Sequence, residues 1–192
     1  MPKRGYHHGN LREALVEACL KLIELKGPTG FTLSEASREA GVTPAAVYRH
    51  FEGREDLIAE AARQGYEIFA DLMEYAYSKG QPSALAAFEA TGRAYLAFAQ
   101  KYPGHYIAMF ESGISINRTP ELNAVATRAL GVLEKAAVDL SQHIPEEKRP
   151  PPQIVRQRRG SPGTKSPYPP EDLLETGIGV YLRGLGLVAP DS

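Results

Sequence analysis

Apolar residues recur every three or four positions along most of this chain, a spacing that predicts amphipathic helices. The pattern predicts helices over residues 10–26, 33–40, 54–77, 83–101, 104–110, 120–143 and 171–187, and a further short helix that begins at Pro44. In the first helix the apolar stripe includes Leu11, Leu15, Leu22 and Leu25. We therefore expect an all-α protein.

Two of these helices are short, lie within residues 31–57, and are joined by a tight turn. Thr32 and Glu35 have the spacing of a capping box, which predicts the start of the first of them. Gly41 is expected to end that helix, since glycine accepts left-handed backbone. Thr43 is expected to cap the second helix, with Pro44 at the first position, where a missing N–H has no cost. The arrangement predicts a helix-turn-helix.

The second short helix has a face that suits the major groove of DNA. Val47 and Phe51 are four residues apart and are expected to face the core. Small residues, a tyrosine, an arginine and a histidine then point outward or sideways: Ala45, Ala46, Tyr48, Arg49 and His50. Reading base edges requires such a short, exposed helix. An ordinary helical hairpin is the alternative interpretation.

Composition adds little to this picture. The net charge is −1, and residues 1–54 hold eight Lys or Arg and six Glu, a sum of +2 before histidine. The single Cys19 excludes an intrachain disulfide and a cysteine-cluster metal site, and is expected in the core. The start of the chain is polar, so we expect no signal peptide. No apolar segment is long enough for a membrane span. We expect a cytoplasmic protein without cofactor or metal.

Signatures of catalysis are weak. The sequence has no phosphate-binding glycine loop and no H-E-x-x-H motif, and the segment Gly-Ile-Ser-Ile at 113–116 lacks the second glycine of a nucleophile elbow. Five scattered His and one Cys suggest no site. We predict that the protein is not an enzyme and has no catalytic residue.

Residues 145–170 differ in character from the rest of the chain. They hold eight of the 15 prolines and six Lys or Arg, which predicts a long basic loop. Its basic part, 148–165, is a candidate for an additional nucleic-acid contact. The apolar helix predicted after it, 171–187, is expected to be covered by another subunit.

The N-terminal third resembles the tetracycline-repressor (TetR) family of bacterial transcription regulators. The resemblance lies in HHGNLREALVEACLKLI and GFTLSEASREAGVTPAAVYRHFEGREDLI, and is specific over residues 6–78. The opening YHHGNL and the later YPGHYIAMF are similar to a subgroup named for a Trp-His-Gly motif. This chain has no Trp, and the Pro/Arg-rich stretch replaces the helix that carries the motif. Either the last helix makes the dimer contact or the sequence is locally altered.

The resemblance implies a DNA-binding domain over residues 1–52 and a ligand-binding and dimerisation domain over residues 53–192. It implies base-edge contacts from Thr43, Pro44, Ala45 and Ala46, and phosphate contacts from Thr32, Tyr48, His50 and Arg54. Arg49 either reads guanine or holds phosphate. The implied protein is a homodimeric repressor that binds a palindromic operator in double-stranded DNA.

The long helix 54–77 is predicted to act as a lever, since it extends roughly 35 Å at about 1.5 Å per residue. A small apolar effector is expected to tilt it and release the DNA. The predicted effector contacts are Phe69, Met73, Phe88, Tyr95, Phe98, Tyr106, Met109 and Phe110. The predicted polar contributors are His105, Tyr106 and Glu111. Plain core packing is the alternative for these residues. A regulator controlled by a protein partner is the alternative function.

Overall fold

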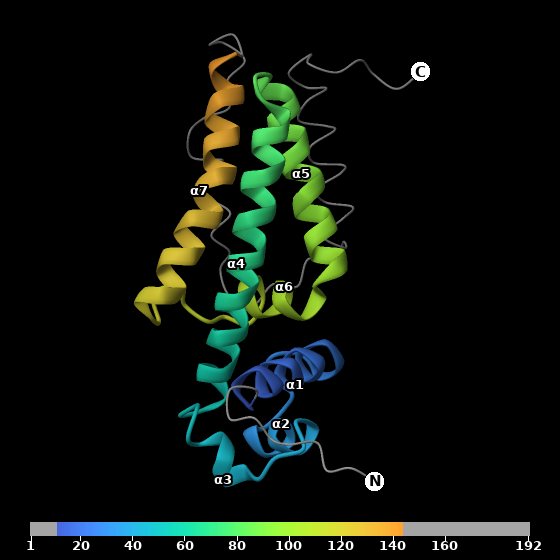
Figure 1. The fold of residues 1–192 in the computed structure, drawn as a ribbon, viewed down its shortest axis with the longest axis vertical. Helices are drawn as coiled ribbons and strands as arrows, with labels where there is room; N and C mark the ends of the chain where they lie inside the picture. The colour runs from blue at the N-terminus through green and yellow to red at the C-terminus, as the bar shows by residue number, and fades with distance from the viewer. Residues whose placement is uncertain (1–10, 144–192) are drawn as a thin grey trace. The chain divides into compact units, whose positions relative to one another are not determined.

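The computed structural model describes residues 11–143, which form seven helices and no strand (Figure 1). The helices are α1 (Leu11–Lys26), α2 (Leu33–Glu39), α3 (Pro44–Val47), α4 (Arg54–Gly80), α5 (Ala84–Lys101), α6 (Pro103–Phe110) and α7 (Pro120–Gln142). The predicted all-α class is confirmed. The predicted loop 145–170, the helix 171–187 and the helix start at Asn10 lie outside the described residues.

The chain divides into two compact units, and α4 contributes to both. Unit 1 comprises Met1–Ile68 and Tyr102–Ala126, and unit 2 comprises Phe69–Lys101 and Thr127–Ser192. The helices α6 and the start of α7 therefore belong with α1, α2 and α3. The domain division that we predict at residues 52 and 53 rests on family resemblance and stays a prediction.

Local sequence signals set the bounds of α2. Glu35 N–H donates to Thr32 Oγ1 over 3.2 Å, and Thr32 N–H donates to Glu35 Oε2 over 2.9 Å, so the predicted capping box is confirmed. Lys26 Nζ lies 2.6 Å from Glu35 Oε1. The hydrogen bonds from Lys26 and Thr32 lower the pKa of Glu35 to about 2. Gly41 has a φ of +70°, the left-handed backbone expected after this helix.

Two expectations for the helical elements are wrong in detail. Thr43 occupies the N-cap position of α3, but its side chain makes no capping hydrogen bond. The regular part of α3 is only four residues long, and a turn over 48–50 continues it to Phe51. Leu25 is 80 % exposed, although the apolar stripe of α1 includes it. Leu25 lies at the edge of the buried stripe, in the last turn of the helix.

The helix α6 packs closely against α1 and α4 inside unit 1. Gly104 N–H donates to Glu24 Oε1 over 3.0 Å, and a Cβ on Gly104 would lie 3.1 Å from the Cβ of Leu20. His105 is buried, and its Nδ1 lies 2.9 Å from the carbonyl oxygen of Ala61. Burial lowers the pKa of His105, although the hydrogen bond to Ala61 opposes that shift. A neutral imidazole that donates to this carbonyl fits the contact.

In unit 2 the second half of α4 lies between α5 and α7 (Figure 1). The ring of Phe69 lies 5.4 Å from that of Tyr95 and 5.0 Å from that of Phe98, measured between centroids. On the other side, Arg128 of α7 pairs with Asp71 at 2.7 Å. Gly80 permits close contact with α5, because a Cβ there would lie 2.2 Å from the Cα of Ala87.

Gly80→Ala is therefore expected to destabilise the protein by roughly 1–3 kcal/mol, the usual cost of overpacking. The control is Gly131→Ala in α7, where an added Cβ meets nothing within 4 Å. This substitution is expected to stabilise by up to about 1 kcal/mol through helix propensity. Urea unfolding measures both free energies. Equal effects of the two substitutions would contradict the packing at Gly80.

Candidate nucleic-acid interface

The segment from Thr43 to Phe51 separates an outer face from a buried one, as predicted. Val47 is 0 % and Phe51 is 2 % exposed, so both are held in the core. The predicted base-edge and phosphate contacts lie outside it: Thr43, Pro44, Ala45, Tyr48 and Arg49 are exposed, and Ala46 and His50 are half-buried. Tyr48, at 61 %, is among the most exposed large hydrophobic side chains of the described residues. These side chains are therefore accessible from solvent, and their contact with DNA stays a prediction.

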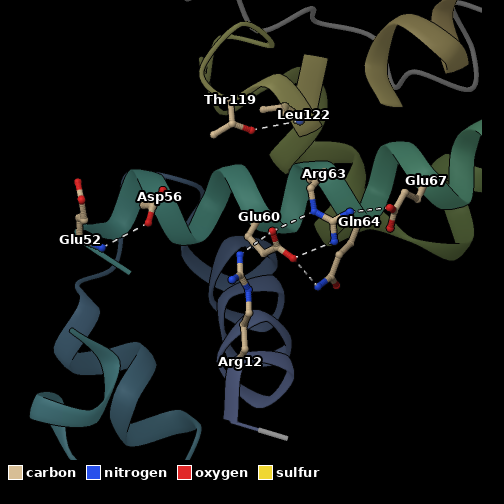
Figure 2. A network of polar contacts seen from close by, with 9 residues as sticks. All are labelled: Arg12, Glu52, Asp56, Glu60, Arg63, Gln64, Glu67, Thr119 and Leu122. Atoms are coloured by element: carbon tan, nitrogen blue, oxygen red, sulfur yellow. Dashed lines mark hydrogen bonds and ion pairs between the residues drawn. The ribbon is translucent and has the colours of Figure 1, made fainter. Parts of the chain in front are cut away.

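A buried carboxylate ties α1 to α4 beside this segment. Figure 2 shows Glu60 receiving hydrogen bonds from Arg12 of α1 and from Arg63 and Gln64 of its own helix. The Arg12 Nη2–Glu60 Oε2 distance is 3.0 Å, and the Arg12 guanidinium also lies 5.3 Å from the centre of the Phe51 ring. Arg12 therefore links three parts of the helix-turn-helix region, namely α1, α4 and the residue that follows the α3 turn.

The charge of Glu60 is stabilised in this setting. Burial by itself raises the pKa of Glu60, but the hydrogen bonds from Arg63 and Gln64 and the nearby charge of Arg12 outweigh it. The net effect lowers the pKa, so the carboxylate is ionised at neutral pH. This site was not predicted from the sequence. The i,i+3 spacing of Glu60 and Arg63 was visible, but Arg12 is 48 residues away and only the fold brings it close.

Two predicted phosphate contacts already have partners within the chain. The hydroxyl of Thr32 takes part in the capping box described above. Arg54 Nη1 donates to the carbonyl oxygens of Thr29 at 3.0 Å and Phe31 at 3.2 Å. Arg54 therefore holds the turn before α2 against the start of α4. A DNA contact from either residue stays a prediction.

The residues predicted to bind an effector fall into both units. In unit 2, three of them are buried (Phe69, Met73 and Phe98) and two are half-buried (Phe88 and Tyr95). In unit 1, Met109 is buried, and Tyr106 and Phe110 are half-buried. In unit 1 the Phe110 ring lies 5.8 Å from Tyr66 and 5.0 Å from Tyr106. Of the predicted polar contributors, His105 is buried and bonded to α4, whereas Glu111 is exposed. Their role in effector binding stays a prediction.

The fold and the exposed face of α3 define a helix-turn-helix protein of the DNA-binding type. Residues 15–61 match the model of bacterial regulatory proteins of the tetR family, and residues 88–188 match that of a tetracyclin repressor-like C-terminal domain. The second match alone covers more than half of the 192 residues. The chain belongs to the TetR family of transcriptional regulators.

Similar proteins carry the same description. The chain is 29 % identical over 100 residues to the uncharacterized HTH-type transcriptional regulator YobS of Bacillus subtilis, a stretch covering 52 % of this chain and 51 % of that one. It is 40 % identical over 63 residues to the HTH-type transcriptional regulator BetI of Rhizobium meliloti, covering 33 % and 30 % of the two chains. The chain thus spans about half the length of the first relative and less of the second.

A solved structure shares the fold. The TetR-family transcriptional regulator PfmR from Thermus thermophilus superposes with a TM-score of 0.62 at 17 % identity, over 89 % of this chain and 98 % of that one. Among residues 11–143, no helix has the length and apolar character needed to cross a bilayer. The same residues contain no cluster of His, Cys, Asp or Glu able to hold a metal ion.

Glu60→Gln is expected to destabilise the protein by about 1–3 kcal/mol at pH 7, since it weakens charge-assisted hydrogen bonds to a buried acceptor. The folded-state pKa of Glu60 lies below its ordinary value of 4.5. Its contribution is therefore complete above pH 4.5 and is lost as the pH falls through the folded-state value. The difference between Glu60→Gln and the unchanged protein should shrink over that range in urea unfolding.

The matched control for this prediction is Glu67→Gln. Glu67 also pairs with Arg63, at 2.5 Å, but its side chain is 48 % exposed. Exposed pairs contribute about 0–1 kcal/mol, so a small effect is expected. A loss at Glu67 as large as that at Glu60 would show that burial of Glu60 does not matter.

Proposed function

We propose that this protein is a transcriptional repressor that binds a palindromic operator as a homodimer and inserts α3 into the major groove. The observation that carries the proposal is the outward face of α3, exposed while Val47 and Phe51 hold the segment in the core. Membership of the TetR family supports it, because that family consists of bacterial regulatory proteins. A cytoplasmic location follows from action on chromosomal DNA.

Within this proposal the exposed residues have different roles. Thr43, Pro44, Ala45 and Ala46 approach base edges, where two alanines supply methyl contacts but no hydrogen bonds. Contact with thymine methyl groups and readout of DNA shape then carry much of the specificity.

The remaining residues of the interface position the protein on the DNA. Tyr48 and His50 contact phosphate, and such contacts fix register without reading sequence. Thr32 and Arg54 act alongside them at the starts of α2 and α4. Arg49 is exposed on the same face and either reads guanine or holds phosphate.

We also propose that a small apolar effector releases the protein from DNA. The match of residues 88–188 to a repressor-like C-terminal domain supports this part, as does the buried aromatic cluster around Phe69. Control by a protein partner is the alternative.

The test starts by selecting bound sequences from a random duplex pool with the full-length protein. A palindrome is expected, with half-sites separated by about one helical turn or a multiple of it. Tyr48→Phe should then weaken binding to the selected site and to scrambled DNA by the same factor, about fivefold per hydrogen bond lost. An altered sequence preference would contradict the assignment of Tyr48 as a phosphate contact.

Tyr75→Phe is the matched control, since Tyr75 is 63 % exposed but lies in unit 2. It should leave DNA binding unchanged. Arg49→Ala decides the role of Arg49. Loss of a phosphate contact makes the plot of log binding constant against log salt concentration less steep by about 0.9. Loss of a guanine contact instead relaxes specificity at one base pair. Failure to select any sequence would overturn the proposed function itself.

A further inference from the structure

A cavity of about 320 Å³ lies within unit 1, away from α3. Three segments line it: the turn before α2, the first turns of α4, and the loop between α6 and α7. Its lining residues include Thr29, Arg54, Glu55, Ser112, Ser115 and Arg118. None of the predicted DNA contacts lines it except Arg54.

The charged groups of this cavity are two guanidiniums and one carboxylate, a sum of +1. Arg118 Nη1 lies 3.2 Å from Glu55 Oε2, and the two side chains are 36 % and 64 % exposed. Exposed ion pairs of this kind are weak and exchange partners readily. Arg118 is thus available to a competing anion that enters the cavity.

Arg54, the first residue of α4, supplies the second guanidinium. Its Nη1 is held by the carbonyl oxygens of Thr29 and Phe31, which fixes the group in place. Its Nε is covered and has no hydrogen-bond partner within the described part of the chain. Of the five N–H donors of a guanidinium, this one has no acceptor among residues 11–143.

The loop between α6 and α7 is shaped by its own hydrogen bonds. Ser112 Oγ donates to Ala108 O over 2.6 Å, Ser115 Oγ accepts from Asn117 N–H, and Arg118 N–H donates to Ser115 O. Gly113 has a φ of +75°, a conformation that favours glycine. The wall that carries Arg118 is thus formed before any ligand arrives, which lowers the entropy cost of binding.

We propose that this cavity binds a small oxyanion, a phosphate or a carboxylate, between Arg54 and Arg118. Planar guanidiniums recognise both groups through paired N–H donors. The first turn of α4 also lines the cavity, and the positive end of its dipole favours negative charge there. A bound anion would join the α6–α7 loop to the turn before α2. The site shares Arg54 with the proposed DNA contacts, so its test is made without DNA; it does not depend on the proposed effector.

The test uses the full-length protein without DNA and inorganic phosphate as the probe. Thermal unfolding is followed against phosphate concentration, with chloride at matched ionic strength as the reference. A ligand that binds only the folded state raises Tm with its concentration. Sodium acetate in a second series distinguishes a general oxyanion site, at which both anions raise Tm, from one selective for phosphate. Because phosphate also stabilises folded proteins by exclusion from their surface, a rise in Tm supports the site only where Arg118→Ala reduces it.

Three variants make the test specific to this cavity. Arg118→Ala is expected to weaken phosphate binding about tenfold, the effect of losing one charge-assisted hydrogen bond. Glu55→Gln is expected to strengthen it, because the competing carboxylate is removed. Arg93→Ala in unit 2, where Arg93 is 70 % exposed, should change nothing. Equal phosphate-induced Tm shifts in all three variants, or no shift in the unchanged protein, would overturn the proposal.

Discussion

The close packing of α6 on α1 and α4 is the constraint on which the rest of unit 1 depends. Gly104 and Gly65 supply the space for it, because a Cβ on Gly65 would lie 2.6 Å from the sulfur of Met109. Glu24 and the carbonyl of Ala61 then satisfy polar groups that this packing buries. A buried donor without a partner would oppose folding, so these contacts permit an intimate helix–helix interface. The helix α6, which follows α5 in the chain, thereby holds α1 and the first half of α4 together.

The same unit presents a helix too short to be stable by itself. Isolated helices below about 12 residues are marginal in water, and α3 has four regular residues. Burial of Val47 and Phe51, and the contact of Arg12 with both Phe51 and Glu60, therefore fix its position. The outward side chains of α3 are presented by the core of unit 1 rather than by the intrinsic stability of the helix.

Most helices within residues 11–143 could be predicted from the sequence because their signals are local. Caps, turn glycines and apolar spacing lie within a few residues of the helix ends that they set, as Thr32, Glu35 and Gly41 show. The missing information is non-local. Apolar spacing cannot show that Arg12 binds Glu60, or that Leu25 is exposed to solvent.

The candidate interface was predictable for a similar reason, since its inward and outward faces follow from helical spacing alone. The cavity beside Arg54 was not, because three segments remote in sequence form it. The grouping of α6 with the helix-turn-helix was also hidden, since the chain reaches α6 only after passing through unit 2.

The central claim is that α6 and the first half of α4 form one structural unit with α1. Native-state hydrogen exchange tests it directly, because amides of a cooperative unit share one opening free energy. Amides of α6 should exchange with the opening free energy and denaturant dependence of α1 and of residues 54–68. Exchange of α6 together with α5, at a free energy different from that of α1, would contradict the account.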